Sequence, residues 1–180
     1  MDQLLDKYLC SKYPKIFAER DMPMDKSCMH WGLAVGNGWF SLIKELCHKI
    51  QFHIDSRNSC IGAGYEYAIK KGEIKQVVAK QIKEKFGGLC FYYDGGDDKI
   101  QGMVDLAEDL SYSICEDCGY MNETVGRSTV GWIKTSCPKH ATSIENFVQT
   151  GDAELINIWK EIQKNDKRQE KIDNEAKAKI

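Results

Sequence analysis

Four residues with the spacing of metal ligands constrain this chain more than any other feature. They form two pairs, Cys115-x2-Cys118 and Cys137-x2-His140, with residues 119–136 between them. Two such pairs can bring four ligands to one point and close a tetrahedron around zinc. Gly119, directly after the first pair, frees the backbone to turn its amides toward a thiolate sulfur. The pattern therefore predicts a zinc site.

We expect this zinc to be structural rather than catalytic. A catalytic zinc keeps one position open for water or substrate, whereas three cysteines and a histidine fill all four positions. The expected cofactor is a structural Zn2+ that pins the returning segment TVGWIKTS, residues 129–136, against the helix expected to end at Ile114.

The chain does not need this metal to compensate for a missing core, because it has 180 residues of which 42% are hydrophobic. Its net charge is -2, so contact with nucleic acid would require a local basic patch. Residues 1–14 contain no apolar run of the signal-peptide type, and no segment approaches the roughly 20 apolar residues of a membrane span. We expect a soluble, intracellular protein with no membrane partner. Of its eight cysteines, the four scattered ones, Cys10, Cys28, Cys47 and Cys60, are expected to be reduced thiols.

Hydrophobic periodicity predicts three helices. A first helix is expected over residues 2–9. Behind the Gly-Asn-Gly turn at 36–38, apolar residues recur at helical spacing over residues 39–54, which indicates a core helix. A second apolar stripe over residues 100–114 follows an aspartate cap at 97 or 98 and delivers the first cysteine pair.

Between these helices, the stretch KQVVAKQIKEKFGGLCFYYDGGDD predicts two β-strands joined at Gly87-Gly88. The cross-strand pairs expected for a two-residue loop are Phe86–Leu89, Glu84–Phe91 and Ile82–Tyr93 on one face and Lys85–Cys90 and Lys83–Tyr92 on the other. The first face is apolar apart from Glu84, whose carboxylate would then have a raised pKa or a basic partner. Alternatively, a bulge at the glycine pair shifts the register and exposes Glu84.

Together these elements predict an α+β fold, in which helices pack on a small antiparallel sheet. Residues 1–140 form the domain, including a zinc knuckle at 115–140, and residues 141–180 form a C-terminal helical extension. Apolar residues between Ile144 and Gln163 can dock as a helix, whereas the last stretch is almost entirely charged. Residues 55–72 stay open between a loop, an insertion and a short helix around residues 65–71.

The blocks GNGWFSLIKELC, QIKEKFGGLCFYY, CEDCG and GWIKTSCPKH occur in this order over roughly residues 36–54 and 77–140. Their combination resembles a family of small, largely uncharacterised proteins encoded by tailed bacteriophages and prophages. Two positions depart from that pattern: Cys90 stands where a basic residue is common, and Lys134 stands where arginine is frequent. The resemblance implies a phage origin and a place in the cytoplasm of an infected bacterium, but it implies no activity.

A second group of residues suits a phosphate-bearing aromatic ligand, since cations bind phosphate oxygens and rings stack on a base. The candidates are Lys83, Lys85, Tyr92, Arg127, Trp132 and Lys134. Tyr65 and Tyr67 join them if residues 55–72 fold over the hairpin. The alternative is an ordinary solvated face with Trp132 in the core. Gly95-Gly96 fits a turn before a helix cap better than a phosphate cradle.

Three classes of function follow from these residues. The first is a phage-encoded, zinc-stabilised binding protein that counteracts bacterial defence by sequestering a small nucleotide immune signal. The second is a zinc module that binds nucleic acid or a host protein. The third is a small hydrolase of a cyclic nucleotide that uses His48, His53 or Glu84. Since His48 and His53 are five residues apart rather than four, they do not share a helical face as ligands would, and we expect a binding protein without catalytic residues.

Overall fold

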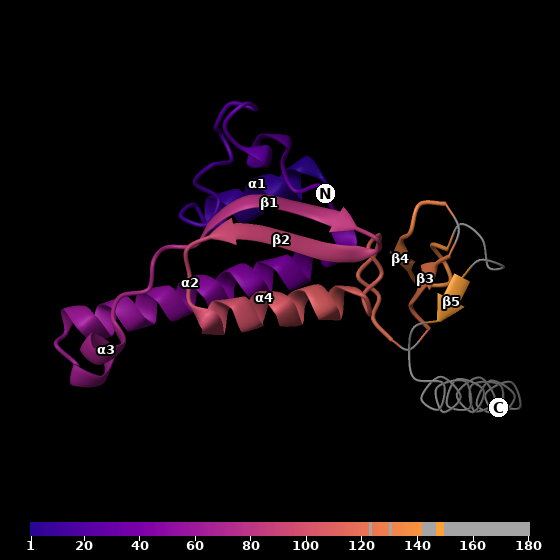
Figure 1. The fold of residues 1–180 in the computed structure, drawn as a ribbon. Helices are drawn as coiled ribbons and strands as arrows, with labels where there is room; N and C mark the ends of the chain where they lie inside the picture. Colours follow the sequence, from indigo (N-terminus) through magenta and orange to yellow (C-terminus); the bar gives the residue numbers. More distant parts are fainter. Residues whose placement is uncertain (123, 130, 142–146, 150–180) are drawn as a thin grey trace, which may run out of the picture.

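The chain has an α+β fold in a computed structural model that describes residues 1–122, 124–129, 131–141 and 147–149. The helices are α1 (Gln3–Lys12), α2 (Phe40–Gly62), α3 (Glu66–Lys71) and α4 (Asp98–Ser111), with the short 3-10 helices η1 (Cys28–Trp31) and η2 (Asn37–Trp39). The strands are β1 (Val78–Lys85), β2 (Gly88–Asp94), β3 (Gly126–Ser128), β4 (Thr135–Ser136) and β5 (Phe147–Gln149). The β1–β2 hairpin lies over α2 and α4, and its turn points toward β3 and β4 (Figure 1).

Helices α1 and α4 begin at aspartate caps, and the cap of α4 was predicted. The side chain of Asp2 accepts a hydrogen bond from the Leu4 amide, and that of Asp97 accepts one from the Ile100 amide at 3.1 Å. Helix α2 begins just behind the Gly-Asn-Gly turn but continues to Gly62, eight residues beyond the predicted end at residue 54. Helix α3 matches the short-helix alternative for residues 65–71.

The predicted hairpin is present, but its turn is Phe86-Gly87 rather than Gly87-Gly88. Lys85 pairs with Gly88 and Glu84 pairs with Leu89, so each predicted partner near the turn is displaced by two positions along β2. Because strand side chains alternate, a displacement of two leaves these residues on their predicted faces. Phe86 and Gly87 both have positive φ angles, +52° and +81°, as this kind of tight turn requires.

Gly88 has a packing role instead of a turning role. A Cβ on this residue would lie under 3.0 Å from the phenol of Tyr112, which follows α4. The glycine therefore lets β2 approach the end of α4 closely, and this contact explains why the second glycine lies within the strand.

Both edges of the hairpin are covered. Ala34 pairs in parallel with Lys83 at the outer edge of β1. At the outer edge of β2, the Leu89 amide donates to Ser111 Oγ at 2.9 Å and the Phe91 amide donates to Glu108 Oε1 at 2.7 Å. Side chains of α4 thus satisfy backbone donors that would otherwise face solvent.

The core lies between the hairpin and the paired helices α2 and α4. Trp39, Ile43, Ile50, Ile82 and Ile100 are fully buried there. Burying each such side chain stabilises the fold by about 1.5–3 kcal/mol, which explains why apolar residues at helical spacing in α2 and α4 define this layer. Cys47 is buried in the same core, as its place in the helical pattern predicts.

Two expectations about chain segments differ from the structure. Helix α3 packs against the end of α2 that is remote from the hairpin turn (Figure 1), so Tyr65 and Tyr67 do not fold over the hairpin face. Phe147–Gln149, expected in a C-terminal helix, form strand β5, which pairs with β3. An aromatic residue followed by valine favours a strand once a partner edge is available. The rest of the predicted helical extension lies outside the described residues.

Candidate metal centre and the adjoining surface

The four predicted ligands converge on one point. Their ligand atoms all lie within 4.8 Å of one another. The sulfurs of Cys118 and Cys137 are 3.9 Å apart, and His140 Nδ1 lies 3.7 Å from Cys115 Sγ and 3.2 Å from Cys137 Sγ. An ion held tetrahedrally at about 2.3 Å from sulfur and 2.0 Å from nitrogen requires separations of roughly 3.5–3.8 Å. The donor set therefore fits a four-coordinate metal site.

Backbone geometry shapes the first ligand pair. Gly119 has a φ of +76°, a conformation that favours glycine, and its amide donates to the Cys115 carbonyl oxygen at 2.8 Å rather than to a thiolate sulfur. Burial opposes ionisation of Cys115, but backbone N–H groups of Cys137, Cys118 and Asp117 outweigh it and lower the pKa of the thiol. A lowered pKa favours the thiolate, which is the form that binds a metal.

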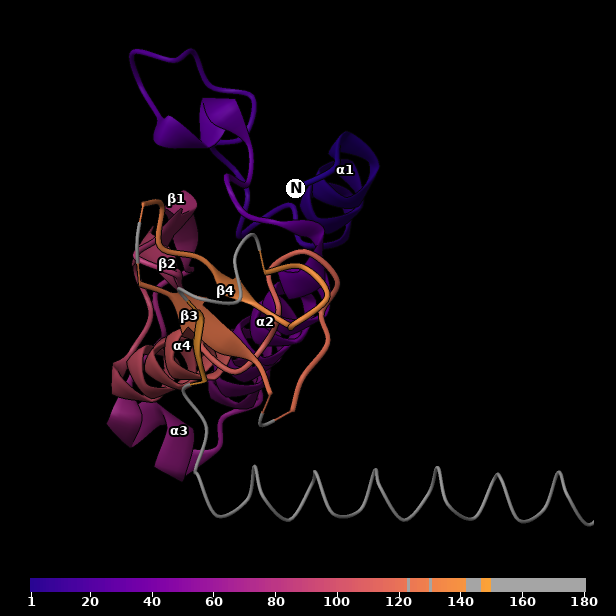
Figure 2. The same cartoon turned by 90° about the vertical axis from the view of Figure 1, so that its right-hand side faces the viewer.

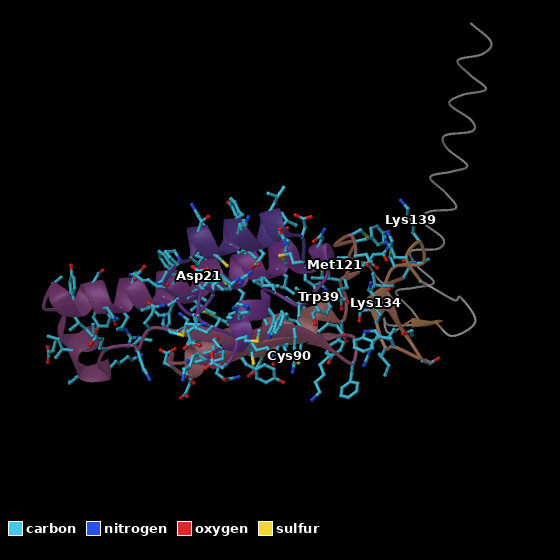
Figure 3. The ribbon with its side chains drawn as sticks, turned by 90° about the horizontal axis from the view of Figure 1, so that it is seen from above. Asp21, Trp39, Cys90, Met121, Lys134 and Lys139 are labelled. Carbon is cyan, nitrogen blue, oxygen red and sulfur yellow. The ribbon has the colours of Figure 1, made fainter. Side chains whose placement is uncertain are left out.

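The Gly-Asn-Gly-Trp turn ahead of α2 packs against this ligand pair and forms hydrogen bonds with it. The indole N–H of Trp39 donates to the Ile114 carbonyl oxygen at 2.9 Å, and the Gly38 amide donates to the Glu116 carbonyl oxygen at 2.7 Å. The Gly36 amide donates to Glu116 Oε1 at 2.8 Å. Figure 3 shows Trp39 where α2 meets residues 115–141, which we call the Cys/His module.

Neither glycine of this turn has room for a side chain. A Cβ at Gly36 would lie under 3.0 Å from the backbone of Glu116, and one at Gly38 would lie under 3.0 Å from backbone atoms of Cys115, Glu116 and Gly119. The sequence predicted these glycines as a helix start only. Their contact with the segment that carries the candidate metal ligands was missed because this segment lies about 80 residues further along the chain.

Glu116 links the turn to the second ligand pair. Its carboxyl is buried, and burial raises its pKa, against which the hydrogen bond from Gly36 acts. Its amide donates to the Thr135 carbonyl oxygen at 3.0 Å, so the strand that leads to Cys137 is fixed to the first pair.

The Cys/His module also forms hydrogen bonds with the backbone of the hairpin turn. Thr135 Oγ1 donates to the Gly87 carbonyl oxygen at 2.5 Å, and the Arg127 guanidinium donates to the Phe86 carbonyl oxygen. The same guanidinium stacks on the ring of Tyr112, 4.8 Å from its centroid. Figure 2 views the molecule from this end, with β3 and β4 in front of α2 and α4.

The two predicted cationic ligand-binding residues of the module are engaged inside the protein. Arg127 holds the hairpin turn, and Lys134 forms an ion pair with Asp117 at 2.5 Å. Their contact with a ligand stays a prediction. Lys134 lies within the Cys/His module in Figure 3, on a different element from the hairpin lysines.

Trp132 is on the surface rather than in the core. Its side chain is 79% exposed, and its indole N–H donates to Glu84 Oε2 at 3.1 Å. Phe86 at the tip of the hairpin is 63% exposed. A cavity of 220 Å3 lies between these segments, and we call it the hairpin-turn cavity; it is lined by Glu84, Lys85, Phe86, Gly131, Trp132 and Ile133.

The remaining predicted residues follow the outer face of the hairpin. Lys83 Nζ lies 5.4 Å from the centroid of the Tyr92 ring, and Lys85 Nζ lies 5.5 Å from that of the Phe86 ring. The structure therefore brings Lys85 and Trp132 to one cavity, with Lys83 and Tyr92 on the adjoining strand face. Phe86 was missed by sequence reasoning, although an aromatic residue directly before a turn glycine is the signal that could have identified it.

The candidate catalytic residues each have another explanation. His48 is exposed on α2, and His53 Nε2 lies 3.0 Å from Asp97 Oδ2 at the start of α4. Burial opposes ionisation of Asp97, but hydrogen bonds from His53 and the Ile100 amide lower its pKa overall. The Glu84 carboxylate accepts the amide of Gly87 at 2.6 Å as well as the indole N–H described above. Its partners are hydrogen-bond donors of the turn and the module, and a bulge is found at residues 79–81 rather than at the turn.

Comparisons with known proteins found no relative. No protein-family model matches the sequence, no curated protein matches it, and no solved structure matches it. Among the described residues, no helix has both the length and the apolar character needed to cross a membrane.

Proposed function

We propose that this chain is a zinc-stabilised binding protein that holds a small nucleotide at the hairpin-turn cavity. One observation carries the proposal: the exposed rings of Phe86 and Trp132, from segments far apart in the sequence, flank one cavity with Lys85 on its lining. Aromatic rings beside a cation are the combination that binds a base and its phosphate.

Trp132 is hydrogen-bonded through both its ring and its backbone, and Phe86 has a defined backbone conformation in the turn. Trp132 is fixed through its indole N–H by Glu84 and through its carbonyl oxygen, which accepts the Ser128 hydroxyl at 2.8 Å. Phe86 has the left-handed φ of +52° and is the one described residue other than glycine with a positive φ. This conformation costs a bulky residue roughly 1–2 kcal/mol, and strain of this size is concentrated at functional sites. A ring fixed before binding loses less entropy on binding.

The cavity is sized for part of a ligand. Its 220 Å3 is below the roughly 300–1,000 Å3 of pockets that enclose whole ligands. A base can enter between the rings while its phosphate stays outside. Lys85, with Lys83 on the same strand face, supplies the cations for that phosphate.

Zinc is the metal that best suits the site, because three thiolates and an imidazole at tetrahedral spacing are its usual structural ligands. The four side chains fill its coordination sphere, so its role is to fix the Cys/His module. With the module fixed, the β3–β4 loop that carries Trp132 stays beside the hairpin. The ion itself supplies no chemistry to the ligand.

The order of the sequence blocks supports a phage origin, and a non-catalytic nucleotide-binding protein in an infected bacterium has a clear use. Bound tightly, it lowers the free concentration of a nucleotide immune signal in the host cytoplasm and so counteracts defence. This mode of action requires stoichiometric binding and leaves the signal chemically intact.

The test is to incubate the purified protein with a panel of cyclic mono- and dinucleotides, separate the complex, heat it and identify the released compound by mass spectrometry. Intact nucleotide supports sequestration. Altered nucleotide overturns it in favour of the hydrolase alternative. No retention of any nucleotide also overturns it and directs the search to a nucleic acid or a host protein.

A matched pair of tryptophans locates the site. Trp132→Ala should weaken binding roughly 5- to 150-fold, since stacking on one base contributes about 1–3 kcal/mol. Trp31 is similarly exposed, at 69%, but lies on η1, so Trp31→Ala should leave the affinity unchanged. Equal effects of the two substitutions would place the ligand elsewhere.

A further inference from the structure

The hairpin-turn cavity contains a carboxylate where a site for phosphate would be expected to hold only cations. Glu84 lines the cavity beside Lys85 and Trp132 and is partly exposed. Both of its oxygens are oriented: Oε1 accepts the Gly87 amide at 2.6 Å, and Oε2 accepts the indole N–H of Trp132 at 3.1 Å. An anion fixed in this way repels phosphate, so it must face another part of the ligand.

An ionised carboxylate can only accept hydrogen bonds, and its two oxygens together offer about four acceptor positions. The protein uses one on each oxygen. The remaining positions, again one on each oxygen, match a group that presents two N–H donors side by side.

Among the common bases, guanine has this pair of donors on its Watson–Crick edge, as N1–H and the N2 amino group. Adenine and cytosine each place an amino group next to a ring nitrogen that accepts. Uracil has one N–H between two carbonyl oxygens. Each of these three bases would bring an acceptor toward the carboxylate, and two acceptors face to face repel.

We propose that Glu84 selects a guanine base in the nucleotide held at this cavity, an inference that rests on the proposed function. The carboxylate lies at the edge of the Trp132 indole, because it accepts the indole N–H. A base stacked on that ring therefore presents its own edge to the same carboxylate. The bond from Gly87 keeps Glu84 in this orientation before the base arrives.

Isothermal titration calorimetry tests the selection with the cyclic mono- and dinucleotides of guanine, hypoxanthine and adenine. Hypoxanthine keeps N1–H but lacks the N2 amino group. Guanine should bind roughly ten- to hundredfold more tightly than hypoxanthine, which is the effect of one hydrogen bond to a charged group. Adenine should bind more weakly still.

Glu84→Gln separates recognition from a structural role, since it preserves size and replaces one acceptor by a donor. It should reduce the preference for guanine over adenine at least tenfold. A substitution that acts only on the fold would instead weaken all bases equally and lower the melting temperature. Glu66→Gln, on the exposed face of α3, is the control and should change neither quantity.

The outcomes distinguish guanine selection by Glu84 from the proposed binding of a nucleotide at the hairpin-turn cavity. Nucleotides that bind equally well whatever their base, or an unchanged base preference in Glu84→Gln, refute guanine selection and leave nucleotide binding standing. Binding of no nucleotide at all refutes both.

Discussion

The close contact between the Gly-Asn-Gly-Trp turn and the Cys/His module can be tested with Gly38→Ala. Gly38 does not have a positive φ, so alanine is compatible with its backbone conformation. The new Cβ would nevertheless lie under 3.0 Å from backbone atoms of Cys115, Glu116 and Gly119. Backbone at a ligand pair cannot move aside as a flexible side chain can. The module must therefore shift away from α2.

The expected loss of stability has two parts. Overpacking in a well-packed region costs typically 1–3 kcal/mol. Displacing the module also lengthens the 2.7 Å hydrogen bond from the Gly38 amide to Glu116, which contributes roughly 0.5–1.5 kcal/mol. The sum is about 1.5–4.5 kcal/mol, or a fall of roughly 3–18 °C in melting temperature for a chain of this size.

Urea denaturation and thermal melting of the zinc-loaded protein provide the measurement, and Gly102→Ala provides the matched control. Gly102 lies in α4, and nothing lies within 4 Å of the position where its Cβ would be. Alanine there should stabilise the protein by roughly 0.5–1 kcal/mol, because glycine weakens a helix interior. If Gly38→Ala proved as stable as the unsubstituted protein, the turn would not be in the close contact with the Cys/His module that is described above.

Three further predictions concern the metal, the start of α4 and the hairpin tip. Freshly purified protein should contain about one equivalent of zinc by elemental analysis, and less than about half an equivalent would argue against the site. Cys118→Ser should lower the melting temperature, whereas Cys28→Ser, a substitution of an exposed cysteine outside the site, should not. Burial opposes ionisation of Asp97, but hydrogen bonds from His53 and the Ile100 amide lower its pKa in the folded protein. The charged carboxylate therefore stabilises the fold fully above the unfolded pKa of about 3.9. This stabilisation is lost as the pH falls through the lower pKa of the folded protein. The melting-temperature difference between the protein and Asp97→Asn should therefore shrink below pH ~4, and a constant difference would contradict this assignment. Phe86→Asn should change the free energy of unfolding by less than about 1 kcal/mol, because relief of the left-handed φ offsets the lost ring contacts, while nucleotide affinity falls; a loss above about 2 kcal/mol would mean the ring supports the fold.

The sequence predicted features that depend on nearby residues. The apolar stripes and the Asp97 cap define α4, and the paired spacing of cysteines and histidine defines the metal ligands, because each pattern reflects the geometry of a short segment. The hairpin register was wrong by two positions because two adjacent glycines look like a turn. Only the packing of Tyr112 against Gly88 shows that one of them serves a tertiary contact.

The candidate binding site shows the same division. Lys85 and Trp132 were selected for their side-chain chemistry, and the structure brings them to one cavity. The partners of Arg127 and the exposure of Phe86 could not be derived, since both follow from how the module meets the hairpin turn. Contacts across tens of residues leave no periodic trace in a single sequence.

The hydrogen bonds from β2 to α4 affect how the protein meets other chains. A strand edge with free amides can recruit a strand from another molecule, which is a common route to aggregation and to β-augmented complexes. On β2, Ser111 and Glu108 already accept the Leu89 and Phe91 amides, so an incoming strand would have to displace a hydroxyl and a carboxylate. The aromatic tip of the hairpin can thus stay exposed while these two amides of the β2 edge are not available to pair with another strand.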